Sequence, residues 1–149
     1  MKAVFFYKSM LYDVNINLWA TLAAAFAHMI LGSLWYGPFF GKAWMKSIGK
    51  DPNVPIDDKM KKEGQKAMMM VMPASLLTAY ILAHFIDFTA SVTALEGAQT
   101  GFWIWLGFQA TLIFQYVLFE GKKKMTALIN ASNQLVGFML MGEILAVWA

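Results

Sequence analysis

The chain has 149 residues, of which 59% are hydrophobic and 14% are charged, and its formal net charge is +3. This composition is typical of a membrane protein and argues against a soluble domain. Every basic residue is a lysine and there is no cysteine. The sequence therefore lacks the arginine forks that bind nucleic-acid phosphates, and it lacks disulfides and thiolate ligands, so we expect no nucleic-acid partner.

Four apolar runs are each near the ~20 residues that a helix needs to cross a hydrocarbon core about 30 Å thick. They leave no room for a soluble domain, and we expect no signal peptide in the N-terminal stretch. We therefore expect residues 1–149 to form a single integral-membrane domain, an all-α up-down bundle of four transmembrane helices. The predicted spans are residues 16–37, 67–88, 102–119 and 125–148.

Lysines gather in two of the connections between spans. Seven lie between residues 42 and 66, after the first span, and three lie at residues 122–124, after the third. The opposite side carries only Lys2 and Lys8. By the positive-inside rule, we expect both lysine-rich connections in the cytoplasm and both termini outside.

The first span ends in the sequence LGSLWYGPFFGKAWMKSIG, where Gly37 and Pro38 should break the helix. In the segment that follows, apolar and lysine side chains fall on two opposite faces of a helix, which predicts a short helix lying in the membrane interface. Its lysines would meet anionic headgroups, and lipid is the simplest partner. The residues expected at the lipid interface are Trp35, Tyr36, Lys42, Trp44 and Lys46.

Three blocks of the chain carry a family resemblance. They are WYGPFFGKAW after the first span, FEGKKK after the third, and LINASNQLVGFMLMGEILAVW in the fourth. The chain, from roughly Asn15 to the C-terminus, resembles the small bacterial membrane proteins of domain-of-unknown-function family 1761. The resemblance implies a four-span, multi-pass protein of the bacterial cytoplasmic (inner) membrane. It implies no established activity and supplies no catalytic residues.

Polar and small residues form stripes along three of the spans. Such stripes let membrane helices approach closely and hydrogen-bond, each bond contributing about 0.6–2 kcal/mol. The alternative is that they line a polar path. The candidates for either role are Asn17, His28, Gln109, Gln115, Asn130, Asn133 and Gln134.

His28 is the deepest ionisable residue of the predicted spans. A charged imidazole would be costly there, so we expect it to be neutral and hydrogen-bonded, with an amide of the fourth span as the candidate partner. A proton relay would need a second titratable group at the same depth, and the sequence shows none. This favours a structural role over proton transfer.

Three ionisable residues should lie at one depth near the outer surface. His84 and Asp87 share a face at the end of the second span, and Glu143 lies near the end of the fourth. If helix order brings them together, they could bind a divalent metal or exchange a proton. Otherwise Asp87 ends a helix at the water boundary, and Glu143 reaches water or another subunit.

The sequence contains no catalytic motif and no cofactor-binding motif, so we expect no cofactor and no enzyme activity. The favoured function is a non-enzymatic helical bundle that associates with itself or with another membrane protein. One alternative is a small oligomeric channel or transporter for an ion or a polar solute. A membrane enzyme or metal-binding protein is the weakest alternative.

Overall fold

The computed structural model describes residues 15–54, 57–121 and 123–148. Within these ranges the chain forms helices and no strand, which confirms the all-α class. The elements are α2 (Leu18–Leu34), the π-helix η1 (Trp35–Phe39), α3 (Gly41–Ser47), α4 (Asp58–Phe88), α5 (Ala94–Ile104), the π-helix η2 (Trp105–Ala110), α6 (Thr111–Phe119) and α7 (Lys124–Val147).

In the described part of the chain, three continuous helical segments are long and apolar enough to cross a membrane. They are Leu18–Phe39, Asp58–Phe88 and Ala94–Phe119, and each overlaps one of the first three predicted spans. The fourth predicted span coincides with α7, which is not among the three, because amides and Glu143 reduce its apolar character. Four crossing helices therefore remain a prediction.

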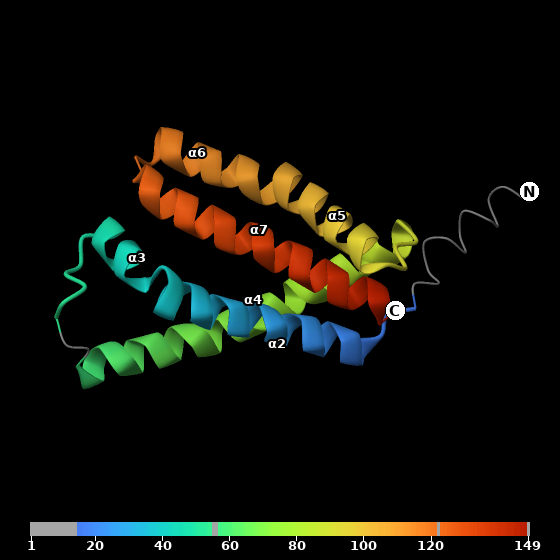
Figure 1. Cartoon of the computed structure of the whole chain (residues 1–149), viewed down its shortest axis with the longest axis horizontal. Coiled ribbons are helices and arrows are strands. Elements are labelled where there is room, and N and C mark those ends of the chain that lie inside the picture. The colour runs from blue at the N-terminus through green and yellow to red at the C-terminus, as the bar shows by residue number, and fades with distance from the viewer. Residues whose placement is uncertain (1–14, 55–56, 122, 149) are drawn as a thin grey trace, which may run out of the picture.

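Helix α7 packs against α5, α2 and α4. In Figure 1 the chain runs to and fro, so that the start of α2, the end of α4 and the end of α7 lie towards one end. The apolar core lies among α2, α4 and α7, and alanines of α2 and α4 allow the helices to approach closely. The buried core residues are Ala20, Ala24, Ala25, Ala79, Leu82, Ala83, Ile86, Phe138, Met141, Leu145 and Ala146.

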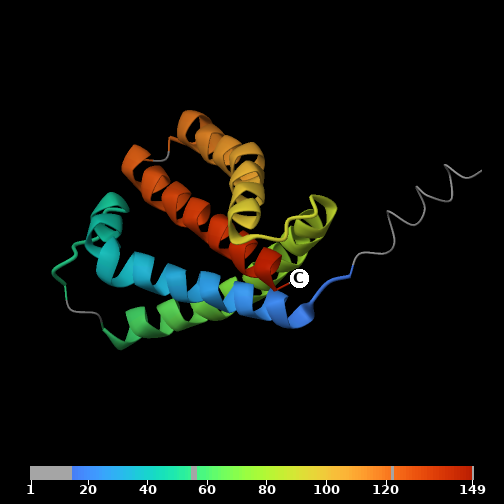
Figure 2. The ribbon, with the colours of Figure 1, turned by 45° about the vertical axis from the view of Figure 1, so that its right-hand side comes forward.

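The helices separate away from this core. The first half of α4 has no buried residue before Ser75, and α6 has none. Figures 1 and 2 both show α6 and the start of α4 far apart, on opposite sides of the molecule. Each of these two segments consequently exposes most of its surface to its surroundings.

Helices α4 and α5 start at local capping signals. Asp57 caps α4 by accepting a hydrogen bond from the backbone N–H of Met60 at 2.7 Å, and aspartate is among the residues preferred at this position. Helix α5 begins at Ala94, well before the predicted start of the third span at residue 102. The reason is a capping box in which the side chains of Thr93 and Glu96 each accept from the other residue's backbone N–H. The predicted connection 89–101 is thus mostly helix.

The break expected at Gly37 and Pro38 takes the form of the π-helix η1. Gly37 has non-helical dihedral angles, φ −97° and ψ −105°, and Pro38 lacks a backbone N–H donor. The backbone N–H of Phe40 then reaches back to the carbonyl of Trp35 at 2.8 Å. The expected short helix follows as α3, with Lys42 and Lys46 exposed; its place in a membrane interface stays a prediction.

Candidate functional site

The candidate site is the polar face of α7. The C-terminal end of α7 is held by Asn17 of the α2 N-cap. The side-chain oxygen of Asn17 caps α2 by accepting from the backbone N–H groups of Trp19 at 3.0 Å and Ala20 at 3.2 Å. Its Nδ2 donates to the carbonyl oxygen of Trp148 at 2.9 Å. One amide thus satisfies donors at the start of α2 and an acceptor at the end of α7.

The other end of the polar face is held by two aromatic residues of η1. Trp35 Nε1 donates to the carbonyl oxygen of Ile129 at 3.1 Å, and the Tyr36 hydroxyl donates to Asn130 Oδ1 at 3.0 Å. Both were expected at the lipid interface, where tryptophan and tyrosine are common. Their polar atoms bind α7, so two of the blocks that carry the family resemblance contact each other, and the place of the two rings at a lipid interface stays a prediction.

Helix α3 also packs against the start of α7. Thr126 Oγ1 donates to Ser47 Oγ at 2.9 Å, and Ser47 Oγ donates to the carbonyl oxygen of Trp44 at 2.7 Å. The Trp44 ring lies edge-on to Tyr36, with centroids 5.5 Å apart. The lysines of α3 remain exposed while its small residues face the bundle.

His28 lies where α2, α4 and α7 meet. Its Nδ1 is 3.1 Å from Ser75 Oγ of α4. Its ring lies on Gly137 of α7, where a Cβ would be 2.6 Å from His28 Cδ2. The partner of His28 is therefore Ser75 and not the predicted amide of the fourth span. Ser75 was not among the predicted site residues. Gly137 provides the room for the imidazole.

Two buried side-chain N–H groups have no hydrogen-bond partner among the residues of the described ranges: Asn133 Nδ2 and Trp105 Nε1. Asn133 is only 3% exposed. Buried donors without a partner are rare in proteins and each needs an explanation, such as a bound water or ligand.

Helices α5 and α7 approach through glycine. A Cβ on Gly97 would clash with the backbone of Gly142 and with the side chain of Ala146, and a Cβ on Gly101 would clash with the backbone of Phe138. The spacing Gly97-x-x-x-Gly101 is the small-residue motif of closely packed membrane helices. The motif is visible in the sequence, but the contact that it makes was not predicted.

The three candidate glutamines take different positions. In the α5–α7 contact Gly97 faces Gly142, so the register places Trp105 level with Gln134, which is half-buried. Gln109 is half-buried in η2, and Gln115 is exposed on α6. The sequence pattern predicts that the amides of α7 lie on one face of the helix. In the structure Asn130 lies on the side of α2–η1, whereas Gln134 lies on the side of α5–η2.

The candidate metal ligands do not form a cluster. The described residues contain no group of three or more histidine, cysteine, aspartate or glutamate side chains that could hold a metal. His84 Nδ1 lies 2.9 Å from the carbonyl oxygen of Tyr80 on its own helix. Met141 and Leu145 face the core with α4, and each is about 160° around α7 from Glu143. Glu143 therefore points away from the helix that carries His84 and Asp87.

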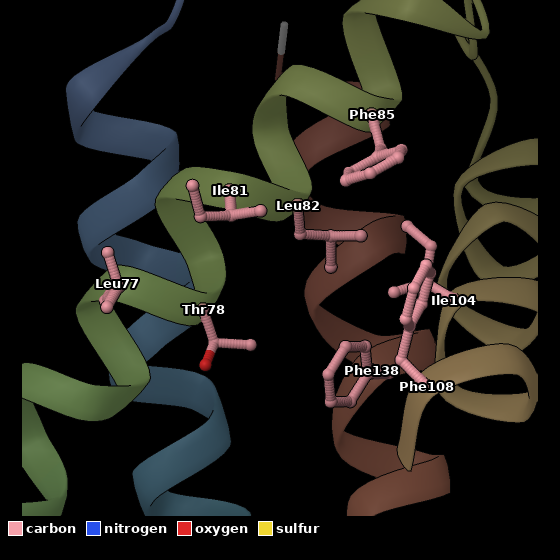
Figure 3. Close-up of a pocket in the computed structure, with 8 residues that line it drawn as sticks. All are labelled: Leu77, Thr78, Ile81, Leu82, Phe85, Ile104, Phe108 and Phe138. Atoms are coloured by element: carbon pink, nitrogen blue, oxygen red, sulfur yellow. The ribbon is translucent and has the colours of Figure 1, made fainter. Parts of the chain in front are cut away.

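A groove of about 340 Å³ opens between α4 and the α5–η2 segment. Figure 3 shows its α4 wall on one side, Ile104 and Phe108 on the other, and Phe138 of α7 between them. Its one polar side chain is Thr78, whose hydroxyl donates to the carbonyl of Ala74 at 2.9 Å. Among the described residues that line the groove, the Thr78 hydroxyl can therefore offer a solute only its acceptor lone pairs.

The described polar contacts join one helix to another. Hydroxyl, amide and indole groups of α2, η1 and α3 bond to α7, and the imidazole of His28 is paired with a hydroxyl. The chemistry that this arrangement supports is recognition between helices.

Comparison with known proteins gives one family. The family model described as "Protein of unknown function (DUF1761)" matches residues 19–146. No curated protein and no solved structure matches the chain.

Proposed function

The chain belongs to the DUF1761 family of proteins of unknown function, and on that premise we propose that it is a non-enzymatic, self-associating bundle in the bacterial inner membrane. In this proposal α2–η1, α4, α5–α6 and α7 all cross the bilayer. Lipids surround the bundle, and the partner protein is a second copy of the chain.

The proposal that α7 crosses the membrane is supported by hydrogen bonds that join it to the apolar segment α2–η1 near both ends of that segment. Trp148 is bonded to Asn17 at the start of α2, and Asn130 is bonded to Tyr36 in η1. Helix α7 has 24 residues and is therefore about 36 Å long, enough to span a core of about 30 Å. If Leu18–Phe39 crosses the membrane, these bonds favour α7 crossing beside it.

The orientation proposed from the lysines is supported by where these segments lie. Figure 1 shows α3, the start of α4 and the start of α7 at the end of the molecule opposite the described C-terminal end of α7. Lys42 and Lys46 of α3, Lys59 of α4 and Lys124 of α7 are all exposed at that end. The positive-inside rule assigns it to the cytoplasm.

Self-association is carried by one observation: the stripe Gly107–Thr111–Gln115 faces outward. All three residues are exposed, and a Cβ on Gly107 would meet nothing within 4 Å. Stripes of small and polar residues in the spans are predicted to pack against another helix, and no helix of the described chain covers this one. A second copy would fit, since a glutamine amide both donates and accepts and can pair with its symmetry mate across a two-fold axis.

A pore through the middle of a single chain is disfavoured because its centre is filled by apolar side chains. Leu82, Ile86 and Met141 are almost completely buried between α2, α4 and α7. They are close-packed with the alanines of α2, as in the interior of a soluble protein.

Cysteine cross-linking tests the proposal, because the chain has no native cysteine. Single cysteines at Thr111 and Gln115 should give disulfide-linked dimers in isolated membranes under mild oxidation. Phe26→Cys is the matched control, since Phe26 is also exposed, on α2, and lies outside the stripe. Cross-linking to a product of another mass would indicate a different partner protein.

The proposal also requires that Gln115→Leu weaken association, seen as a smaller dimer fraction by light scattering in mild detergent. A protein that is monomeric in detergent and gives no dimer from either cysteine would contradict self-association. A protein released from membranes by alkaline carbonate would contradict the integral-membrane assignment.

A further inference from the structure

We draw no further inference here: the strongest candidate, the apolar groove of about 340 Å³ between α4 and the α5–η2 segment, carries none because its lining side chains bear no charge and nothing in the structure shows what covers it.

Discussion

Gly97 of α5 and Gly142 of α7 touch through their backbones. A Cβ added to either residue would overlap the carbonyl oxygen of the other. When two helix backbones are this close, Cα–H groups of one helix contact carbonyl oxygens of the other. These contacts contribute modestly to helix association. The contact holds the α5–η2–α6 segment against the rest of the bundle, because α5 has its main neighbour in α7.

We predict that Gly97→Ala destabilises the protein by about 1–3 kcal/mol, the range for overpacking a tight contact, because the two backbones must separate. The measurement is unfolding of the purified protein in mixed detergent micelles. Gly64→Ala provides the control, since a Cβ there meets nothing within 4 Å. Equal stability of the two variants would show that α5 and α7 do not approach closely.

The bond between Tyr36 and Asn130 gives a second prediction. Tyr36→Phe removes the hydroxyl donor at 3.0 Å and leaves the ring that packs on Trp44. Together with Asn130→Leu, it should give a double-mutant coupling energy of about 0.6–1.7 kcal/mol, the range for hydrogen bonds between membrane helices. Additive effects of the two substitutions would mean that the bond contributes nothing.

A third prediction separates the two roles of Asn17. Asn17→Ala removes both the cap of α2 and the donor to Trp148, and should cost about 0.5–2 kcal/mol. Asn17→Asp keeps a capping oxygen and loses the donor, so it should cost less. Both variants would be measured by thermal unfolding in detergent, and an aspartate variant as unstable as the alanine variant would assign the whole effect to the contact with α7.

Much of this arrangement follows from local sequence. The apolar runs predict α2–η1 and α4. Aspartate is a common helix cap, and Asp57 has this role in α4. Thr93 and Glu96 carry an equally local signal, yet reading residues 89–101 as a connection concealed the start of α5. Boundaries were therefore predictable wherever capping residues were considered.

The partners of the polar residues were less predictable, because they depend on helix order. Asn130 and His28 stand out as polar groups in apolar segments, but their partners, Tyr36 and Ser75, are set by which helices are neighbours. Sequence periodicity gives the face that a residue occupies and not the helix that covers it. Gly97 was missed because a glycine contributes space and no chemistry.

The fourth prediction concerns divalent cations. Because Glu143 points away from His84 and Asp87, and no metal-ligating cluster occurs in the described ranges, added Mg²⁺, Mn²⁺ or Zn²⁺ should not raise the unfolding midpoint of the purified protein. A ligand that binds only the folded state would raise it progressively with concentration. A rise that Glu143→Gln abolishes would restore the metal site, with the missing ligands coming from a second copy.

The last prediction decides whether α7 crosses the membrane. The bond from Asn17 to Trp148 places the start of α2 and the end of α7 together, so reporters fused to either terminus should be active outside the cytoplasm. A reporter inserted at Asn53, between α3 and α4, should be active inside. Truncation after Gly121 with a fused reporter removes α7 and should return the C-terminus to the cytoplasmic side. If the full-length C-terminus is also cytoplasmic, α7 does not cross, and the chain has three membrane helices, the same number that length and hydropathy select.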